Sequence, residues 1–200
     1  MQKKPITNKL LWIFAVGQFG WSLLSGIVAN WMVYYYTGTP DEQNPLTGIF
    51  ASGITQHPIV FKLTLFGLVL AVGRIFDAVT APLIAGWSDR AKFKGGRRIP
   101  FMRTFAVPFA LITIGLFTLP QTGDIVINDV ILFALLITFY LFMTMYCTPY
   151  NALISEFGKT QEDRMYISTA ISLTFFFGTL MAYLPFALAG PLQGILGYAW

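Results

Sequence analysis

Four long intervals of this 200-residue chain carry no charged side chain. They run from Leu10 to Pro40, from Thr104 to Gly123, from Val130 to Ser155 and from Met165 to Trp200. Each can hold the roughly 20 residues that cross a bilayer as a helix. Only 11% of the chain is charged and 56% is hydrophobic, whereas about one-quarter of an ordinary soluble domain is charged. The chain is therefore predicted to fold in a membrane.

Five membrane-spanning helices are expected, over residues 10–36, 59–88, 101–120, 129–154 and 166–190. Backbone groups in lipid must be satisfied within one segment, and the charge-free runs are far longer than the strands of a membrane barrel. After Gly190 only PLQGILGYAW remains, which is too short to cross at about 1.5 Å per residue. We therefore expect an all-α integral membrane bundle over residues 1–200 that lacks a sixth helix.

The basic side chains favour one orientation of these helices, because cytoplasmic loops retain Lys and Arg. With the N-terminus inside, 11 of the 13 basic residues face the cytoplasm, Lys62 lies outside and Arg74 lies within a span. The outer loops carry Asp41, Glu42 and Asp124 instead. We expect a multi-pass protein of the cell membrane with a cytoplasmic N-terminus.

Several function classes receive no support from the residues present. The net charge of +4 does not indicate a nucleic-acid partner, because no soluble fold here can present a basic surface. The single cysteine, Cys147, excludes an internal disulfide and a cysteine metal cluster. The only histidine, His57, is expected to be solvated in an outer loop. No phosphate loop or nucleophile triad indicates an enzyme, and no cofactor is predicted.

Arg74 and Asp77 interrupt the second expected span near its middle. Together with Ala81 they follow one helical stripe, at positions i, i+3 and i+7. Insertion scales assign about 2.5 to 3.5 kcal/mol to each such charge at the bilayer centre, so the two side chains are predicted to face protein or a wet cavity. Two interpretations remain open: a buried ion pair that fixes helix packing, or a cation or proton site on a transport pathway.

The connection between the second and third spans, GWSDRAKFKGGRR over residues 86–98, resembles the loop signature of the major facilitator superfamily. A glycine precedes an Asp-Arg pair there, and Gly-Arg-Arg follows. A closer resemblance covers most of the chain: its segments look like those of the glycoside-pentoside-hexuronide cation symporters, the group of the melibiose permease. The segments are GQFGWSLLSGIVANWMVYYYTG (17–38), GRIFDAVTAP (73–82), GGRRIPFM (95–102) and TPYNALISEFGKTQEDR (148–164).

This resemblance implies a twelve-helix transporter made of two six-helix halves, with a solute cavity between them at mid-membrane and alternating access. The chain would supply most of the N-terminal half. The sixth helix and the second half would come from the rest of a longer protein or from a second chain. The implied function is secondary active symport of a small solute, a sugar or glycoside, coupled to H⁺ or Na⁺ without covalent catalysis.

The chain also departs from the family pattern. In the second helix, R-x-x-D-x-x-x-D-P is matched by Arg74, Asp77 and Pro82, but its second aspartate is Ala81. A sodium site that needs two carboxylates would lose one ligand. The acidic sugar-binding positions of the first and fourth helices correspond to Ser22 and Cys147, neither of which can serve as a charged acceptor. The hypothesis that follows is that Asp77, next to Arg74, carries a proton or a weakly selected cation.

Two groups of further residues are candidates for the solute cavity and for a gate. The candidates for the cavity are side chains that can hydrogen-bond a sugar hydroxyl, or can instead hold helices together: Gln18, Ser22, Asn30 and Tyr150. The resemblance suggests a cytoplasmic gate built from Gly86, Asp89, Arg90, Arg97, Arg98, Glu156 and Arg164. The alternative is a set of independently solvated loop charges, in which each exposed ion pair contributes about 0 to 1 kcal/mol.

Two other functions fit the same pattern. One is a carrier of a non-sugar solute, such as an amphiphile or a lysolipid, because the acidic sugar-binding positions are missing. The other is a membrane sensor or scaffold that keeps the fold but does not transport. A sensor binds solute without uptake, which separates it from a carrier.

Overall fold

The computed structural model describes residues 8–37, 53–55, 58–60, 63–91, 96–118, 122–158, 160–185 and 187–188. Five helices account for most of this range: α1 (Asn8–Tyr36), α2 (Leu65–Arg90), α3 (Arg98–Phe117), α4 (Ile125–Phe157) and α5 (Gln161–Met181). The helical bundle confirms the predicted fold class. Predictions that fall outside the described residues concern Lys3, Lys4, Asp41, Glu42, His57, Lys62, Lys92, Lys94, Lys159 and residues 191–200.

Four of the five helices are long and apolar enough to cross a membrane. They are α1 from Leu11, α2, α3 and α4. The helix α5 is not among them, because its first turn carries Glu162 and Asp163 and its length includes several Ser and Thr residues. The expected fifth span continued to Gly190, whereas α5 ends at Met181.

The second span begins later than the sequence predicted. Instead of a helix from Ile59, the chain forms a short antiparallel pair of strands, β1 (Pro58–Val60) and β2 (Leu63–Thr64). Thr64 then caps α2, because its side chain accepts a hydrogen bond from the amide of Gly67 at 3.2 Å. A side-chain cap satisfies one of the amides that a helix leaves unpaired at its N-terminus.

Side-chain caps also fix where α4 and α5 begin. Asp124 accepts a hydrogen bond from the amide of Val126 at 2.9 Å. Thr160 and Asp163 form a reciprocal capping box at the start of α5. Before α3, Gly96 adopts a φ of 122°, a left-handed conformation that glycine reaches without steric cost. This conformation explains the glycine directly in front of Arg97 and Arg98.

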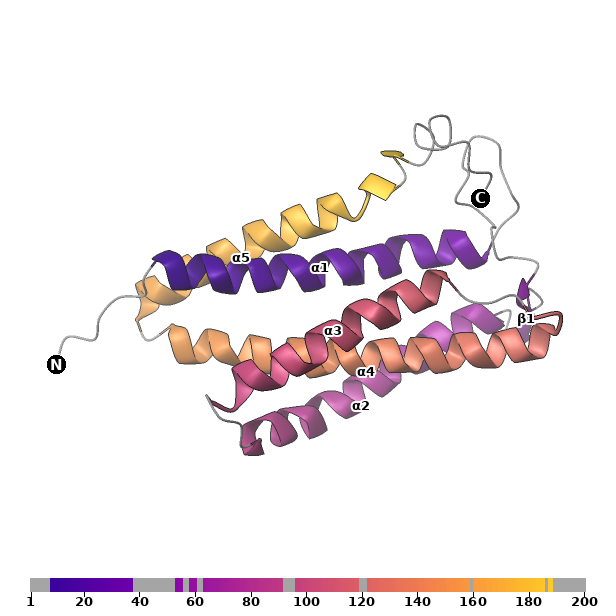
Figure 1. Ribbon diagram of the computed structural model, residues 1–200, viewed down its shortest axis with the longest axis horizontal. Coiled ribbons are helices and arrows are strands. Elements are labelled where there is room, and N and C mark those ends of the chain that lie inside the picture. The colour runs from indigo at the N-terminus through magenta and orange to yellow at the C-terminus, as the bar shows by residue number, and fades with distance from the viewer. Residues whose placement is uncertain are drawn as a thin grey trace.

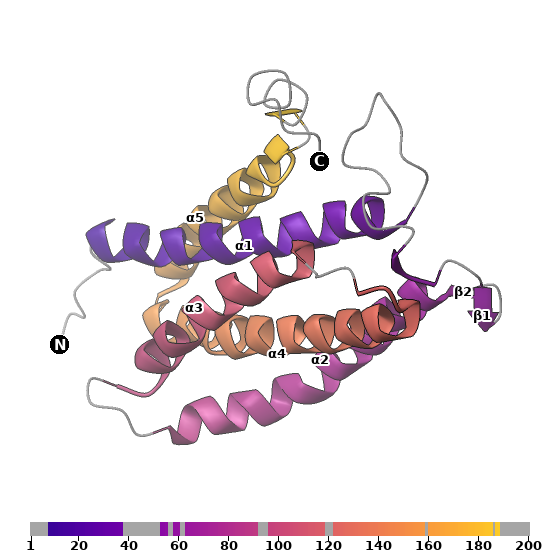
Figure 2. The same ribbon diagram turned by 45° about the vertical axis from the view of Figure 1, so that its right-hand side comes forward.

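The helices form two groups, which Figures 1 and 2 show from two directions. The helix α4 packs against α2 and α3, and α5 lies along α1. Successive helices alternate in direction, so the N-termini of α1, α3 and α5 meet the C-termini of α2 and α4. We call this the basic end, since it carries Arg90, Arg97, Arg98, Arg103 and Arg164.

Small residues let α1 and α5 approach closely. A Cβ placed on Gly178 would lie 2.0 Å from the Ser22 hydroxyl oxygen and 2.9 Å from the carbonyl oxygen of Phe19. One turn further along both helices, a Cβ on Gly26 would lie 2.9 Å from the Cβ of Ala182. The spacing of four residues on both helices is the small-residue pattern typical of packed membrane helices.

The main apolar core lies where α1, α2, α3 and α4 meet, away from the basic end. Its fully buried side chains include Met32, Tyr36, Leu116, Leu132 and Leu136. Many other large apolar side chains on the outer surfaces are exposed, as expected of a bundle that contacts lipid or further protein. The core therefore fixes α1 against the α2–α3–α4 group at one end of the bundle.

Candidate functional site

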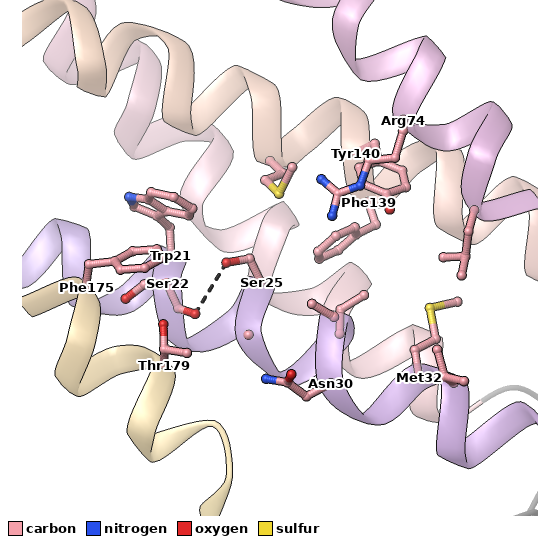
Figure 3. A pocket seen from close by; sticks show the side chains of 16 residues that line it. Trp21, Ser22, Ser25, Asn30, Met32, Arg74, Phe139, Tyr140, Phe175 and Thr179 are labelled. Carbon is pink, nitrogen blue, oxygen red and sulfur yellow. Dashed lines mark hydrogen bonds between the residues drawn. The ribbon is translucent and has the colours of Figure 1, made fainter. Parts of the chain in front are cut away.

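A cavity of about 490 Å³ separates α1 and α5 from α2 and α4. One face of α1, from Trp21 to Val33, forms its longest wall, and Figure 3 shows the side chains that surround it. Polar groups reach it from α1 through Ser25 and Asn30, and from α5 through Thr179. The cavity thus combines an apolar surface with a few polar groups, which is typical of small-molecule sites.

Arg74 on α2 supplies the charge in this cavity. Its guanidinium carbon lies 5.2 Å from the centre of the Tyr140 ring on α4, an arrangement that favours cation–π attraction. Figure 3 shows the guanidinium beside that ring. Within the described part of the chain, Arg74 forms no ion pair and no hydrogen bond through its side chain.

Asp77, one turn along α2, has a different partner. The hydroxyl of Thr144 on α4 donates a hydrogen bond to the Asp77 carboxylate, which is partly buried. The two ion pairs among the described residues both involve Arg98 and lie at the basic end. Of the two interpretations that the sequence left open, the ion pair between Arg74 and Asp77 is not formed in this conformation, where each side chain contacts its own partner on α4.

The Thr144 hydroxyl has two possible acceptors. Besides Asp77, it lies 2.7 Å from the carbonyl oxygen of Tyr140. A hydroxyl has one proton to donate and can accept hydrogen bonds through its lone pairs. When Asp77 is ionised, Thr144 donates to the carboxylate. When Asp77 is protonated, Asp77 can donate to Thr144, which then donates to the Tyr140 carbonyl. The same three groups thus accommodate both protonation states.

Two of the four residues predicted for the cavity line it. Asn30 lies at its edge, where its amide oxygen accepts a hydrogen bond from the Tyr183 hydroxyl at 3.2 Å. Ser22 also lines it, but the side chain is 1% exposed and its hydroxyl donates to the carbonyl of Phe19 at 3.0 Å. Ser22 is therefore used mainly in packing against α5.

The other two predicted cavity residues lie elsewhere. Gln18 is buried, with 2% of its surface exposed, and it does not line the cavity. Tyr150 stacks on Phe14, with ring centres 4.2 Å apart, and its hydroxyl donates to the Phe14 carbonyl at 2.9 Å. Neither residue lines the cavity in this conformation, and Tyr150 instead joins α4 to α1.

The charges predicted for a gate meet around Arg98 at the N-terminus of α3. Its Nη2 atom lies 2.6 Å from the Asp89 carboxylate on α2, and its Nη1 atom lies 2.6 Å from the Glu156 carboxylate on α4. Nη1 also donates to the carbonyl of Ala152 at 3.2 Å. The side chain of Arg98 is only 18% exposed, whereas its two acidic partners are about half exposed. One arginine therefore connects three helices.

The remaining gate candidates have looser or local contacts. Arg97 donates to the backbone carbonyl of Asp89 at 3.4 Å, and Arg164 donates to the carbonyl of Gly158 at 2.8 Å. Arg90 is exposed, without an ion pair among the described residues. Gly86 is also exposed, and a Cβ there would meet nothing within 4 Å. The expected pairing of Arg90 and Arg164 with the acidic residues is therefore absent from the described structure.

Sequence reasoning missed Thr144 and Tyr140 as partners of the two charges. A signal was available, since Tyr140 and Thr144 are four residues apart and so share a face of α4, as Arg74 and Asp77 share a face of α2. It also missed Trp21 at the cavity wall, whose ring centre lies 6.0 Å from that of Phe175. Its indole N–H is buried without a hydrogen-bond partner among the described residues.

Comparison with known proteins agrees with this arrangement. Residues 13–199 match the family described as MFS/sugar transport protein. An uncharacterized symporter of Synechocystis sp. is 34% identical over 134 residues, which cover 58% of this chain and 25% of that protein. The uncharacterized symporter YnaJ of Bacillus subtilis is 26% identical, with 86% of this chain and 35% of that protein covered.

An isoprimeverose transporter of Lactiplantibacillus pentosus is 23% identical, with 92% of this chain and 34% of that protein covered. This chain thus spans about a quarter to a third of the length of these relatives. No solved structure matches it at a significant level. The chain belongs to the MFS/sugar transport protein family, as its resemblance to the glycoside-pentoside-hexuronide cation symporters implied, and this is a family of transporters rather than enzymes.

Proposed function

We propose that the protein containing this chain is a secondary active transporter that moves a sugar or glycoside together with a cation by alternating access. The observation that carries the proposal is the cavity of about 490 Å³, which lies between two groups of helices and is lined by Arg74, one turn from Asp77 within the second span. The relatives named symporters and the isoprimeverose transporter support the same class of activity.

Asp77 is the coupling group in this proposal. Its hydrogen bond to Thr144 lies between α2 and α4, next to the helices that line the cavity. The Thr144 hydroxyl can donate a hydrogen bond to the ionised carboxylate or accept one from the protonated carboxyl group. Ala81 replaces the second acidic residue of the family pattern, which favours a proton over sodium as the coupling ion.

The Arg98 network is the gate in this proposal. Its hydrogen bonds tie α3 to the ends of α2 and α4, and release of either acidic partner frees one helix end. The positive-inside rule supports a cytoplasmic position for this basic end and for the N-terminus. The network then holds the cytoplasmic side together while the opposite side opens.

Uptake into proteoliposomes tests the proposal, with the longest natural form of the protein and imposed proton or sodium gradients. Labelled pentosides, glycosides and hexuronates should include a solute whose accumulation depends on the gradient and collapses when the gradient is dissipated. Asp77→Asn should abolish accumulation but retain exchange of solute across the membrane. If Asp77→Asn accumulated solute to the wild-type level, Asp77 would have no part in coupling.

A further inference from the structure

The residues that follow α5 are fastened to α1. The indole N–H of Trp31 donates to the carbonyl of Ala182 at 2.5 Å, one residue after α5 ends at Met181. The rings of Trp31 and Tyr183 meet edge to face, with centres 6.4 Å apart. The close approach of Gly26 to Ala182 lies at the same level. The position of Tyr183 against α1 therefore rests on contacts that do not need its hydroxyl group.

The Tyr183 hydroxyl holds a residue of the cavity wall. It donates to the amide oxygen of Asn30 at 3.2 Å, and Asn30 lines the cavity whereas Tyr183 does not. The terminal torsion of an asparagine side chain has two broad orientations, and this hydrogen bond selects the one in which the oxygen faces Tyr183. The amide nitrogen, with two N–H donors, forms no hydrogen bond with a described residue.

The other polar side chains of the α1 wall have their donors engaged or covered. The hydroxyl of Ser22 donates to the carbonyl of Phe19, and that of Ser25 donates to the carbonyl of Ser22 at 3.3 Å. The indole N–H of Trp21 is buried. Within the described part of α1, the Asn30 amide is therefore the side-chain group that can still donate a hydrogen bond to an occupant of the cavity.

We propose that Asn30 donates a hydrogen bond to one oxygen of the transported glycoside and that Tyr183 positions the Asn30 amide for this contact. The inference rests on the transport function proposed above and assigns one contact of its solute. A donor that is already oriented loses less conformational entropy when the solute binds. Tyr183 acts through Asn30 without touching the solute, so it is a positioning residue at the end of α5.

Equilibrium binding tests this inference independently of transport. The probes are methyl xyloside, methyl glucoside and isoprimeverose, titrated calorimetrically against the longest natural form of the protein. The tightest-binding probe is then compared with its monodeoxy analogues, each of which lacks one hydroxyl group. The variants at Asn30 are Asn30→Ala and Asn30→Asp; the latter keeps an acceptor for Tyr183 but has no amide donors.

Tyr183→Phe removes the hydroxyl and keeps the ring that packs on Trp31. Its matched control is Tyr166→Phe, because Tyr166 is an exposed tyrosine of α5 that lies outside the cavity. Both tyrosine variants should unfold at the temperature of the wild type, so that a change in binding reflects the Asn30 contact rather than a loss of structure.

For one hydroxyl of the solute, the wild type should bind the deoxy analogue about 2-fold to 10-fold more weakly than the parent, the range of a neutral hydrogen bond. That difference should vanish in both Asn30 variants, shrink in Tyr183→Phe and persist in Tyr166→Phe. A purely structural role of Asn30 or Tyr183 would weaken parent and analogue alike and would leave their ratio unchanged.

The inference is overturned if every parent-to-analogue ratio in the Asn30 variants equals that of the wild type, or if no probe binds the wild type. An unchanged ratio in Tyr183→Phe would overturn the positioning role of Tyr183. Failure of the proposed transport function has a different signature: binding that depends on Asn30 and on one solute hydroxyl, without accumulation of that solute in proteoliposomes under either gradient.

Discussion

The Thr144 hydroxyl on α4 donates a hydrogen bond to the Asp77 carboxylate on α2, close to the carbonyl of Tyr140. Asp77 therefore does not pair with Arg74, which was one of the two interpretations open from the sequence, and Arg74 lines the cavity. Two charges on neighbouring turns of α2 therefore have separate surroundings. In the proposed mechanism, this separation leaves Asp77 and Thr144 as the coupling group.

Replacing Thr144 should weaken coupling more than solute binding. Thr144→Val keeps the shape of the side chain but removes the hydroxyl, so the ionised form of Asp77 loses its donor. A hydrogen bond to a charged group contributes about 1.5 to 3 kcal/mol, which corresponds to roughly a 10-fold to 100-fold change in an equilibrium constant. Proton-driven accumulation should fall by about tenfold or more, while solute affinity changes little.

Thr144→Ser is the matched control, because it retains the hydroxyl. It should accumulate solute within about twofold of the wild type, as expected when a hydrogen bond is conserved. Accumulation ratios in proteoliposomes and calorimetric affinities measure the two properties separately. If Thr144→Val accumulated solute as well as Thr144→Ser, the hydroxyl would have no part in coupling.

Arg98 should matter more for transport than any other described arginine at the basic end. Arg98→Gln removes the two ion pairs that connect α3 with α2 and α4. The two acidic partners are about half exposed, so each pair contributes at most about 1 kcal/mol. We expect a several-fold loss of initial uptake rate with little change in expression, and Arg103→Gln should retain the wild-type rate.

A charge exchange checks the Arg98 prediction more directly. Asp89→Arg places two positive charges against each other and should reduce uptake further than Arg98→Gln. Combining Asp89→Arg with Arg98→Asp restores opposite charges between positions 89 and 98 but places a carboxylate beside Glu156, so only part of the rate should be recovered. Additive losses in the double variant would show that the two side chains act independently and would count against a shared gate.

The sequence was sufficient for those features that depend on hydrophobicity and charge along the chain. Long charge-free runs predicted the helices. Asp89 and Arg98 lie on either side of one short connection, which is why the sequence could place them near each other. The predicted helix boundaries were wrong where a local side-chain hydrogen bond determines where the helix begins. Thr64 starts α2 six residues later than the expected start at Ile59, and hydrophobicity alone carries no sign of such a cap.

Partners across the bundle were harder to predict, because they depend on how each helix is rotated about its axis. Gln18 and Asn30 are equally polar on α1, yet Gln18 is buried away from the cavity and Asn30 lines it. Helical periodicity defines relative positions on one helix, but it leaves the direction of each face open. That is also why Thr144 was not recognised as the partner of Asp77.

Gly178 should tolerate no side chain. A Cβ at this position lies 2.0 Å from the Ser22 hydroxyl oxygen and 2.9 Å from a backbone carbonyl, so α1 and α5 must separate. Overpacking of this kind costs about 1 to 3 kcal/mol. Gly178→Ala should therefore lower the thermal unfolding temperature of the purified protein in detergent. Removing the hydroxyl as well, in Gly178→Ala with Ser22→Ala, should restore part of the loss.

Gly20→Ala provides the comparison for Gly178, since a Cβ there meets nothing within 4 Å. In a helix interior, alanine is favoured over glycine by about 0.5 to 1 kcal/mol, so Gly20→Ala should be neutral or slightly stabilising. Similar unfolding temperatures for the two alanine variants would contradict the close approach of α1 and α5.

Asn128 should be the most sensitive polar residue at the end of the bundle opposite the basic end. It is 1% exposed, its amide nitrogen donates to the Gly53 carbonyl at 2.9 Å, and its oxygen accepts from the Thr122 hydroxyl at 2.6 Å. Asn128→Leu leaves these buried groups unsatisfied, at about 1 to 3 kcal/mol each.

Asn128→Asp keeps the acceptor but loses the donor, so it should unfold at a temperature between Asn128→Leu and the wild type. Asn151→Asp, at an exposed position of α4, should unfold at the wild-type temperature. Equal unfolding temperatures for all of these variants would show that the Asn128 hydrogen bonds do not hold residues 53–55 against α4.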